Sequence, residues 1–314
     1  MSTSRQWAIT GAAGFLGSHV VDHLLARGTP VLAVDDVSTG NEAFVARHAG
    51  NPAFTLARQD VRDAAALRAL FEAHRPEAVV HLAALHFIPA CAADPPRTVS
   101  LNVHGTQCVL SAARAAGAGR FWFASAGDVY APSDLPLHEA DSPTGPFNIY
   151  GMTKLIGEQL VALESRGRPD ARFVVGRLFN LYGPRETNPH ILPEVFGQLR
   201  ANPGTPLRLG NLAPTRDLVP VADAARAVVA TLDAAPPGVT TVNVATGVAV
   251  SMWEVLDLIG EVRGEPLRVE TDPAKVRPVE RAHLRADVGK LREMNGWVPH
   301  ADLRRGLAEL LAAG

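Results

Sequence analysis

The sequence has few cysteines: Cys91 and Cys108 are the two among 314 residues. Their spacing matches neither a metal-binding motif nor a disulfide framework, so we expect no metal site and a reducing compartment, the cytoplasm. Runs of lysine and arginine are also missing. The 30 basic residues are balanced by 32 acidic ones, for a net charge of -2. This pattern argues against a nucleic-acid partner.

Long apolar runs are absent as well. The N-terminal stretch 1–10 carries one arginine and no apolar segment of signal-peptide length, and no later segment is long enough to span a membrane. We therefore expect no membrane partner. The chain length and the 47% share of hydrophobic residues suffice for one large α/β domain, alone or with a smaller lobe.

Short apolar segments alternate with helical patterns through the first half of the chain. Strands are expected at 6–10, 30–36, 53–61, 77–85, 120–127 and 171–180. Several are nearly continuous apolar runs, typical of parallel strands covered on both faces. Helical patterns between them, such as 64–75 and 100–117, predict right-handed crossovers. The predicted fold class is α/β, with a doubly wound parallel (Rossmann) sheet.

This alternation ends at about residue 180. The stretch 181–217 is rich in Pro, Gly, Asn and Arg, a composition typical of loops that carry a binding site. A helix over 221–235 and a strand over 240–247 are expected to return the chain to the first domain. We therefore predict one domain over 1–180, joined by 221–247. A smaller C-terminal substrate-binding lobe would comprise 181–220 and 248–314.

A glycine-rich turn follows the first predicted strand. Gly11, Gly14 and Gly17 would permit a tight turn, close approach of the backbone to a pyrophosphate, and close helix–strand packing. The helix that begins with Phe15 and Leu16 would offer free N–H groups and the positive end of its dipole to that anion. The first domain is thus predicted to bind a dinucleotide, with a tight turn that binds nothing as the alternative.

Acidic residues end the next two predicted strands. Asp35, followed by Asp36, lies roughly twenty residues beyond the glycine turn, where a carboxylate accepts hydrogen bonds from ribose hydroxyls and repels a 2′-phosphate. NAD is therefore favoured over NADP, and residues 1–180 would form an NAD-binding domain. Asp60 and Val61 end the third strand, where such folds meet the adenine. A surface turn is the alternative interpretation of Asp35.

Tyr150 and Lys154 lie four residues apart in a helical segment, so they share one face. They follow the fifth strand, at the edge where doubly wound sheets bind ligands. We expect the Lys154 ammonium to stabilise phenolate and to lower the tyrosine pKa from about 10. Tyrosinate would then be the base for a sugar or alcohol hydroxyl while hydride leaves for NAD. A solvated helix face is the alternative.

Several motifs together resemble the extended short-chain dehydrogenase/reductase family, and within it the NAD-dependent nucleotide-sugar epimerases and dehydratases. They are TGAAGFLG (10–17), HLAA (81–84), DVYAPS (128–133), YGMTK (150–154) and RLFNLYGPR (177–185), with APTRDLVPVADAARAV (213–228) and VNVATG (242–247) further on. The resemblance thus covers nearly the whole chain. It implies a nucleotide-sugar substrate and a homodimer paired through two helices.

The resemblance also implies roles for single positions. Tyr150 would be the acid/base and Lys154 the ligand of the nicotinamide ribose. The cofactor channel would be lined by Leu82, Ala83, Ala84 and Asn102. Contacts to the sugar diphosphate and nucleoside would come from Asn180, Arg216 and Arg277, where arginine offers bidentate, permanently charged donors.

Three more polar residues are expected near the substrate. His86 would lie near the nicotinamide and the sugar, where epimerases often present a polar or basic group; a packing histidine is the alternative. Asn188 and His190, in the segment 186–195, would lie over the nucleotide and touch its base or ribose.

One position departs from the family pattern. The family carries Ser or Thr four residues before the tyrosine that here is Tyr130, and this chain has Ala126 there. Ser125 would point to the opposite face of an extended strand. Three interpretations stay open. The strand register shifts so that Ser125 or a water serves; the alanine is an engineered substitution that traps bound sugar nucleotide; or the enzyme works without this hydroxyl, or barely works.

Asp128 bears on the reaction type. Family dehydratases carry Asp and then Glu directly after the threonine, whereas this chain has Gly127 and Asp128, which disfavours 4,6-dehydration. Asp128 occupies the place of a glutamate in decarboxylating members, or is a turn residue. We expect C4 epimerisation of a UDP-linked sugar through a 4-keto intermediate. Decarboxylation or dehydration is the alternative, and a catalytically silent protein that binds NAD or sugar nucleotide is the third hypothesis.

Overall fold

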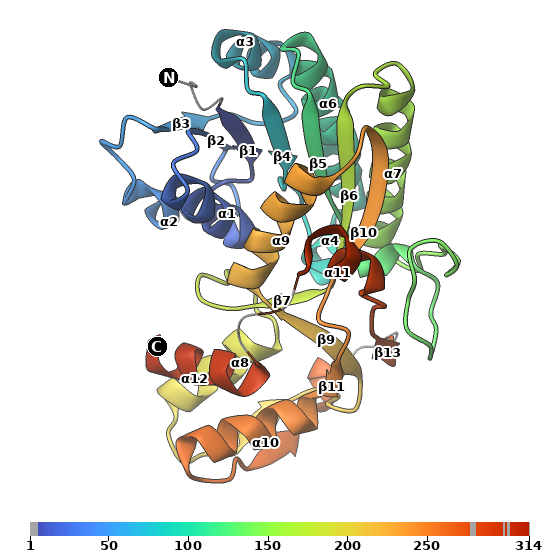
Figure 1. The fold of residues 1–314 in the computed structure, drawn as a ribbon. Coiled ribbons are helices and arrows are strands. Elements are labelled where there is room, and N and C mark those ends of the chain that lie inside the picture. The colour runs from blue at the N-terminus through green and yellow to red at the C-terminus, as the bar shows by residue number, and fades with distance from the viewer. Residues whose placement is uncertain (1–5, 277–280, 298, 300–301, 314) are drawn as a thin grey trace.

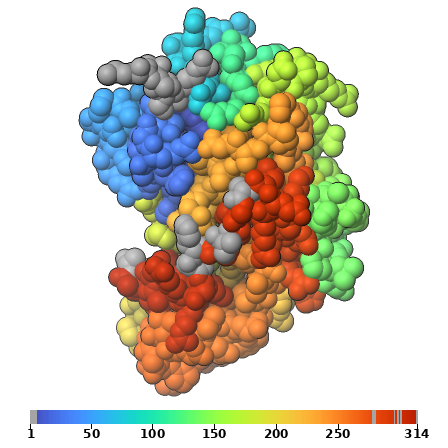
Figure 2. All heavy atoms as spheres, in the orientation of Figure 1, coloured from blue at the N-terminus to red at the C-terminus, as the bar shows by residue number. Residues whose placement is uncertain are grey.

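A computed structural model describes residues 6–276, 281–297, 299 and 302–313. Figure 1 shows a larger α/β lobe above a smaller lobe that contains most of the C-terminal third of the chain. In Figure 2 the orange and red C-terminal segments cover much of the visible lower face. Within the described residues, no helix combines the length and the apolar character needed to cross a membrane.

The larger lobe contains, in chain order, β1 (Trp7–Thr10), α1 (Phe15–Ala26), β2 (Val31–Asp35), α2 (Ala43–Ala46), β3 (Phe54–Arg58), α3 (Ala64–His74), β4 (Ala78–His81), α4 (Ile88–Ala93), α5 (Pro95–Val99), the π-helical turn η1 (Ser100–His104), α6 (Gly105–Ala115), β5 (Arg120–Ala126), the 3₁₀ turn η2 (Gly127–Val129), α7 (Ile149–Arg166), β6 (Arg172–Leu178), α9 (Val221–Ala234), β10 (Gly238–Val244) and α11 (Gly289–Asn295). Its seven strands form one sheet in the order β10-β6-β5-β4-β1-β2-β3. All neighbours are parallel. The predicted doubly wound fold is confirmed.

Apolar runs became strands because both faces of the sheet are covered. β1, β2 and β4 are buried at every residue, as parallel strands between two helical layers should be. One apolar cluster lies between the sheet and the face that carries α1 and α9, and a second lies on the face of α3, α6 and α7. The third and fourth strands end earlier than predicted, at Arg58 and His81, because cavity-lining loops begin there.

The helix predicted over 100–117 begins as a π-helical turn, η1, and continues as α6. Asn102 lies in that turn, which the hydrophobic periodicity did not indicate. A π-helical turn inside a longer helix is frequent at functional sites.

The chain leaves the larger lobe and returns to it. β10 pairs with β6 over 238–244, and α9 packs against α1. Part of the predicted substrate lobe also belongs to this core: Leu284, Leu291 and Trp297 are buried in the same apolar cluster as β1. The expectation that all of 248–314 lies in the smaller lobe therefore fails for α11, which packs against α9 and β10 of the larger lobe.

The smaller lobe contains β7 (Asn180–Tyr182), α8 (Ile191–Ala201), β8 (Leu207–Leu209), β9 (Thr215–Pro220), β11 (Ala249–Ser251), α10 (Met252–Arg263), β12 (Val269–Thr271), the 3₁₀ turn η3 (Pro273–Lys275), β13 (His283–Leu284) and α12 (Leu303–Ala313). α8 falls within the stretch whose composition indicated loops. It forms because Leu192, Val195 and Phe196 are spaced to bury one face. Its proline lies in the first turn, where a helix tolerates it.

Candidate active site

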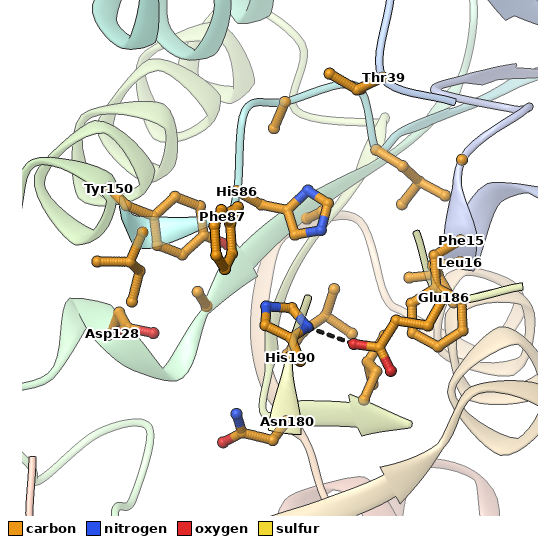
Figure 3. Close-up of a pocket in the computed structure, with 18 of the residues that line it drawn as sticks. Phe15, Leu16, Thr39, His86, Phe87, Asp128, Tyr150, Asn180, Glu186 and His190 are labelled. Carbon is orange, nitrogen blue, oxygen red and sulfur yellow. Dashed lines mark hydrogen bonds and ion pairs between the residues drawn. The ribbon is translucent and has the colours of Figure 1, made fainter. Parts of the chain in front are cut away.

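A cavity of 770 Å³ lies between the two lobes, within the range typical of ligand sites. It extends from the glycine turn before α1, past the start of α7, to β9 and α10 of the smaller lobe. Figure 3 shows Tyr150 and Asp128 on one side, Phe15 and Leu16 on the opposite side, and the His190 ring between the two sides. The carboxyl ends of β1, β2, β4, β5 and β6 border this space, as expected for a doubly wound sheet.

The glycine turn has the shape that a pyrophosphate site requires. A Cβ on Gly17 would lie 1.9 Å from the Gly11 carbonyl oxygen, and a Cβ on Gly11 would lie 2.7 Å from the Ala83 nitrogen, so neither position accepts a side chain. Gly14 is the N-cap of α1, and no side chain caps this helix start. The first N–H groups of the helix, at Phe15 and Leu16, border the cavity and suit an anion.

The turn after β2 matches the second half of a dinucleotide site. Both Asp35 carboxylate oxygens accept backbone hydrogen bonds at 2.8 Å, from the Ala13 and Val37 N–H groups. Burial raises the pKa of Asp35, while these two donors oppose the rise. Asp36 lies beside it and accepts from Ser38. Both carboxylates line the cavity, where their charge would disfavour a 2′-phosphate.

Two predicted cofactor residues differ from expectation. The Asp60 carboxylate pairs with Arg62 at 2.6 Å and does not line the cavity, although its neighbour Val61 does. Asn102 is 2% exposed, and its amide is bonded to both backbone groups of Leu85 and to the Thr153 hydroxyl. Asn102 therefore ties the loop after β4 to α7 rather than lining the channel. Leu82, Ala83 and Ala84 do line the cavity.

Tyr150 and Lys154 lie on one face of α7, with Lys154 Nζ 5.7 Å from the centroid of the tyrosine ring. The Asn148 side chain caps α7 by accepting from the Gly151 N–H at 2.7 Å, which fixes where the first turn begins. Burial lowers the pKa of Lys154 to about 8. Burial raises the pKa of Tyr150, and the negative charge of Asp128 raises it further. The expected lowering of the tyrosine pKa was therefore wrong, since desolvation of the phenol is the largest cause of the shift.

At the end of β5, Ala126 and Ser125 both border the cavity, but the Ser125 hydroxyl is engaged by a buried partner. The Ser125 hydroxyl donates to Glu158 Oε1 at 2.5 Å, and Glu158 is paired with Arg177 at 2.8 Å. This network is buried behind the strand. The alternation of side chains along the strand therefore places a methyl group at the site and the neighbouring hydroxyl on the opposite face. The interpretation in which Ser125 itself serves does not fit this geometry.

Asp128 faces the cavity from the turn η2. Its Oδ1 accepts from the Asn148 amide at 3.3 Å, so it lies beside the residue that caps the Tyr150 helix. Arg281 and Phe147 line the same region. Neither residue lies in one of the sequence motifs. Arg281 is one of three arginines, with Arg277 and Arg285, that follow one another at intervals of four, and nothing in the sequence distinguishes it from the other two.

His86 has its ring on the cavity wall and remains accessible from the cavity. Desolvation by the surrounding protein lowers its pKa to about 4, and the charges of His190 and Lys154 contribute, so the ring is neutral near pH 7. Its Nε2 accepts from the Asn188 amide at 2.7 Å. His190 is bonded to Glu186, as Figure 3 shows, and its ring is tilted against that of Phe87. The loop that was predicted to cover the nucleotide thus meets the loop after β4.

The predicted diphosphate contacts reach the cavity from the smaller lobe. Asn180 begins β7 and Arg216 lies on β9, and both line the cavity. The pairing of β7 with β9 brings these two strands side by side. Arg277 lies outside the described residues. Within the described chain, no group of three His, Cys, Asp or Glu side chains could hold a metal ion.

Comparison with known proteins identifies the family. The sequence model described as "NAD dependent epimerase/dehydratase family" matches residues 7–245. UDP-glucose 4-epimerase of Mycolicibacterium smegmatis is 33% identical, with 96% of each chain covered. GDP-6-deoxy-D-mannose reductase of Pseudomonas aeruginosa is 29% identical, with 97% of this chain and 95% of that protein covered. UDP-glucose 4-epimerase of Thermus thermophilus, solved in complex with NAD, superimposes with a TM-score of 0.85 at 29% identity, covering 98% of both chains. This chain belongs to the NAD-dependent epimerase/dehydratase family and is an NAD-dependent enzyme of the epimerase type.

Proposed function

We propose that the protein epimerises C4 of a UDP-linked sugar through a 4-keto intermediate. The observation that carries this proposal is the position of Tyr150 and Lys154 on one cavity wall, opposite the uncapped glycine turn. A dinucleotide laid across that turn would bring its reactive ring towards the tyrosine. The 4-epimerase names of several relatives favour this reaction over the reduction named for the Pseudomonas relative.

Each side chain has a proposed task. Gly11, Gly14 and Gly17 hold the NAD pyrophosphate, and Asp35 and Asp36 hold its ribose. NAD held there would supply the redox chemistry, acceptance of a hydride from C4 and its return to the opposite face of the ring. Tyr150 must be a phenolate to accept the proton of the C4 hydroxyl, and the resulting phenol returns that proton when the ketone is reduced. Lys154 holds the nicotinamide ribose, and its ammonium offsets the charge that develops on the phenol.

The substrate would extend from Tyr150 towards the smaller lobe. Asn180 and Arg216 contact its diphosphate, with charge-assisted hydrogen bonds from the guanidinium. His86, neutral and hydrogen-bonded to Asn188, offers a polar surface near the sugar rather than a charge. The 4-keto sugar must turn over in the pocket between the two hydride transfers. The apolar walls formed by Leu178, Phe179 and Leu284 would allow it to do so.

Ala126 sets the expected rate. Without a hydroxyl at this position, Tyr150 and the reacting sugar oxygen share no side-chain partner on β5, so turnover should be slow. The second candidate reaction is decarboxylation of a hexuronate. It is suggested by Asp128 in η2, which occupies the position of a glutamate in decarboxylating members of the family. A protein that binds NAD and sugar nucleotide without turnover is the third.

Product analysis decides among these functions. The NAD-loaded protein is incubated separately with UDP-glucose, UDP-galactose and UDP-glucuronate, and the sugar is followed by proton NMR. An epimer of unchanged mass supports the proposal. Loss of carbon dioxide supports the second candidate, and no product from any sugar supports the third and contradicts the lead.

A matched pair of variants tests the role of Tyr150. Tyr150→Phe removes the proposed acid/base and should lower turnover by roughly 10²- to 10⁴-fold. Tyr182→Phe is the control, because the Tyr182 hydroxyl is buried without a hydrogen-bond partner among the described residues and its loss should be nearly neutral. Equal activity of the two variants would contradict the proposed role.

A further inference from the structure

Arg281 is a buried cation whose contacts in the described part of the chain include no anion. It is 7% exposed, and its guanidinium donates to two neutral acceptors, the Tyr130 carbonyl at 2.6 Å and the Ala131 carbonyl at 3.5 Å. Its Nε has no hydrogen-bond partner among the described residues. Buried charges are normally paired, because an unpaired one loses its hydration without compensation. The surroundings of this side chain therefore suit a bound anion.

The position of Arg281 indicates which part of a ligand would supply that anion. The guanidinium stacks over the Phe147 ring, 5.2 Å from its centroid. Phe147 and Asn148 directly precede α7, which carries Tyr150. Asp128 acts on Arg281 electrostatically but forms no ion pair with it among the described residues. Arg281 thus borders the end of the cavity where the chemistry would occur, far in sequence from the glycine turn.

A different arginine serves the nucleotide side. Arg216 lies on β9, and β13 pairs with β9 so that Leu284 is opposite Arg216. Arg281 precedes β13 and turns towards the 128–131 segment. The two arginines therefore come from neighbouring segments but contact different walls of the cavity.

We propose that Arg281 binds the C6 carboxylate of the sugar, so that the substrate is a UDP-hexuronate rather than a neutral UDP-hexose. This inference rests on the proposed function and adds the substrate class to it. A carboxylate presents two oxygens to the Nε–Nη edge of a guanidinium, the bidentate geometry that arginine favours. The same guanidinium could meet a diphosphate instead, and the experiment separates these two anions.

The test measures binding to the NAD-loaded protein by calorimetry, with UDP-glucuronate, UDP-glucose and UDP as ligands. Wild-type protein should bind UDP-glucuronate at least about tenfold more tightly than UDP-glucose. Arg281→Gln should weaken UDP-glucuronate by roughly ten- to a hundredfold and leave UDP-glucose and UDP within about twofold. Arg281→Lys should lose part of the preference, since it keeps the charge but not the two parallel donors.

Arg285→Gln is the matched control. Arg285 is exposed and lies four residues further on in the same segment. Its substitution by Gln changes the net charge by the same amount as Arg281→Gln. It should leave all three affinities unchanged. Melting temperature and NAD affinity are measured for each variant, because Arg281 also holds two backbone carbonyls. If Arg281→Gln does not fold, two measurements still test whether Arg281 binds the carboxylate. They are the wild-type comparison of UDP-glucuronate with UDP-glucose and the same comparison in Arg281→Lys.

Three results would overturn the assignment. Equal binding of UDP-glucose and UDP-glucuronate by the wild type would show that the protein does not recognise the C6 carboxylate. Equal weakening of all three ligands in Arg281→Gln would place the diphosphate at Arg281. Failure to bind any of the three would contradict the proposed nucleotide specificity as a whole. Lack of turnover with intact preference would contradict the epimerase function alone and leave the assignment of Arg281 standing.

Discussion

At residue 126 a methyl group lines the cavity while the adjacent hydroxyl is bonded behind the strand. Ala126→Thr or Ala126→Ser should add the missing hydrogen-bond partner of the sugar oxygen and of Tyr150. A hydrogen bond to a group that develops charge contributes about 1.5–3 kcal/mol, so turnover should rise roughly ten- to a hundredfold. Steady-state kinetics with the sugar identified by NMR measures this rise. An unchanged rate would show that the hydroxyl is not needed here.

Ser125 provides the complementary test. Ser125→Ala breaks the bond to Glu158 but leaves the bond from Arg177 Nε to Glu158 Oε1 at 2.9 Å. The loss should cost about 1–3 kcal/mol of unfolding free energy, measured by urea denaturation, while turnover stays within about twofold. A collapse of turnover with unchanged stability would revive the interpretation in which Ser125 replaces the missing hydroxyl.

Lys154 makes a prediction about pH. Burial holds its folded-state pKa at about 8, below the ordinary 10.5, so between these values the unfolded chain binds more protons than the folded one. The free energy of unfolding contributed by this group therefore rises with pH through that window. Relative to Lys154→Met, wild-type stability should increase by about 3 kcal/mol between pH 7 and pH 11. Urea unfolding at both pH values measures the difference, and a constant difference would contradict it.

At the scale of elements, the glycine turn and α8 contain glycines with opposite roles. Gly17→Ala would force a Cβ to within 1.9 Å of the Gly11 carbonyl oxygen. The turn before α1 would have to move, at a cost of about 3 kcal/mol, with loss of NAD binding. A Cβ added to Gly197 would meet no atom within 4 Å, so Gly197→Ala should stabilise α8 by about 0.5–1 kcal/mol. Thermal melts with and without NAD distinguish the two, and equal effects would contradict the packing argument.

The local sequence pattern predicted those helices and strands whose burial is uniform along their length. The sheet strands are buried on both faces, so their apolar runs were visible in the sequence, and the glycine spacing marked the turn before α1. α8 was obscured because it contains a proline and a glycine, although its apolar residues keep helical spacing. The π-helical turn η1 has no such signature, since its conformation depends on the bonds that Asn102 makes to Leu85 and Thr153.

The site shows the same division. Tyr150, Lys154, Asp35 and the glycines were found because each has a fixed place relative to a strand end. Arg281 was not found, because its importance comes from contacts with Tyr130 and Ala131, about 150 residues away in the chain. The shift in the Tyr150 pKa was predicted with the wrong sign, because the spacing reveals the neighbouring ammonium and not the burial of the phenol.

For the whole molecule, the implied homodimer can be tested through α7. Met152, Ile156 and Leu163 are exposed on one face of this helix, with exposed fractions of 45%, 37% and 62%. We propose that a second copy covers this face. Ile156→Glu should then give a monomer in sedimentation velocity, because a buried carboxylate would be unpaired. Leu135→Glu, in an exposed loop, is the control. A monomeric wild type would contradict the proposal.

The return of the chain end to the first core has a consequence for synthesis. β10 is an edge strand of the large sheet and α11 packs against it, while Leu284, Leu291 and Trp297 belong to the core of that lobe. A nascent polypeptide emerging from the ribosome therefore cannot complete the core of the larger lobe until residue 297 has been translated. Until then its apolar interior stays open to water, and chaperone engagement during translation should persist to that point.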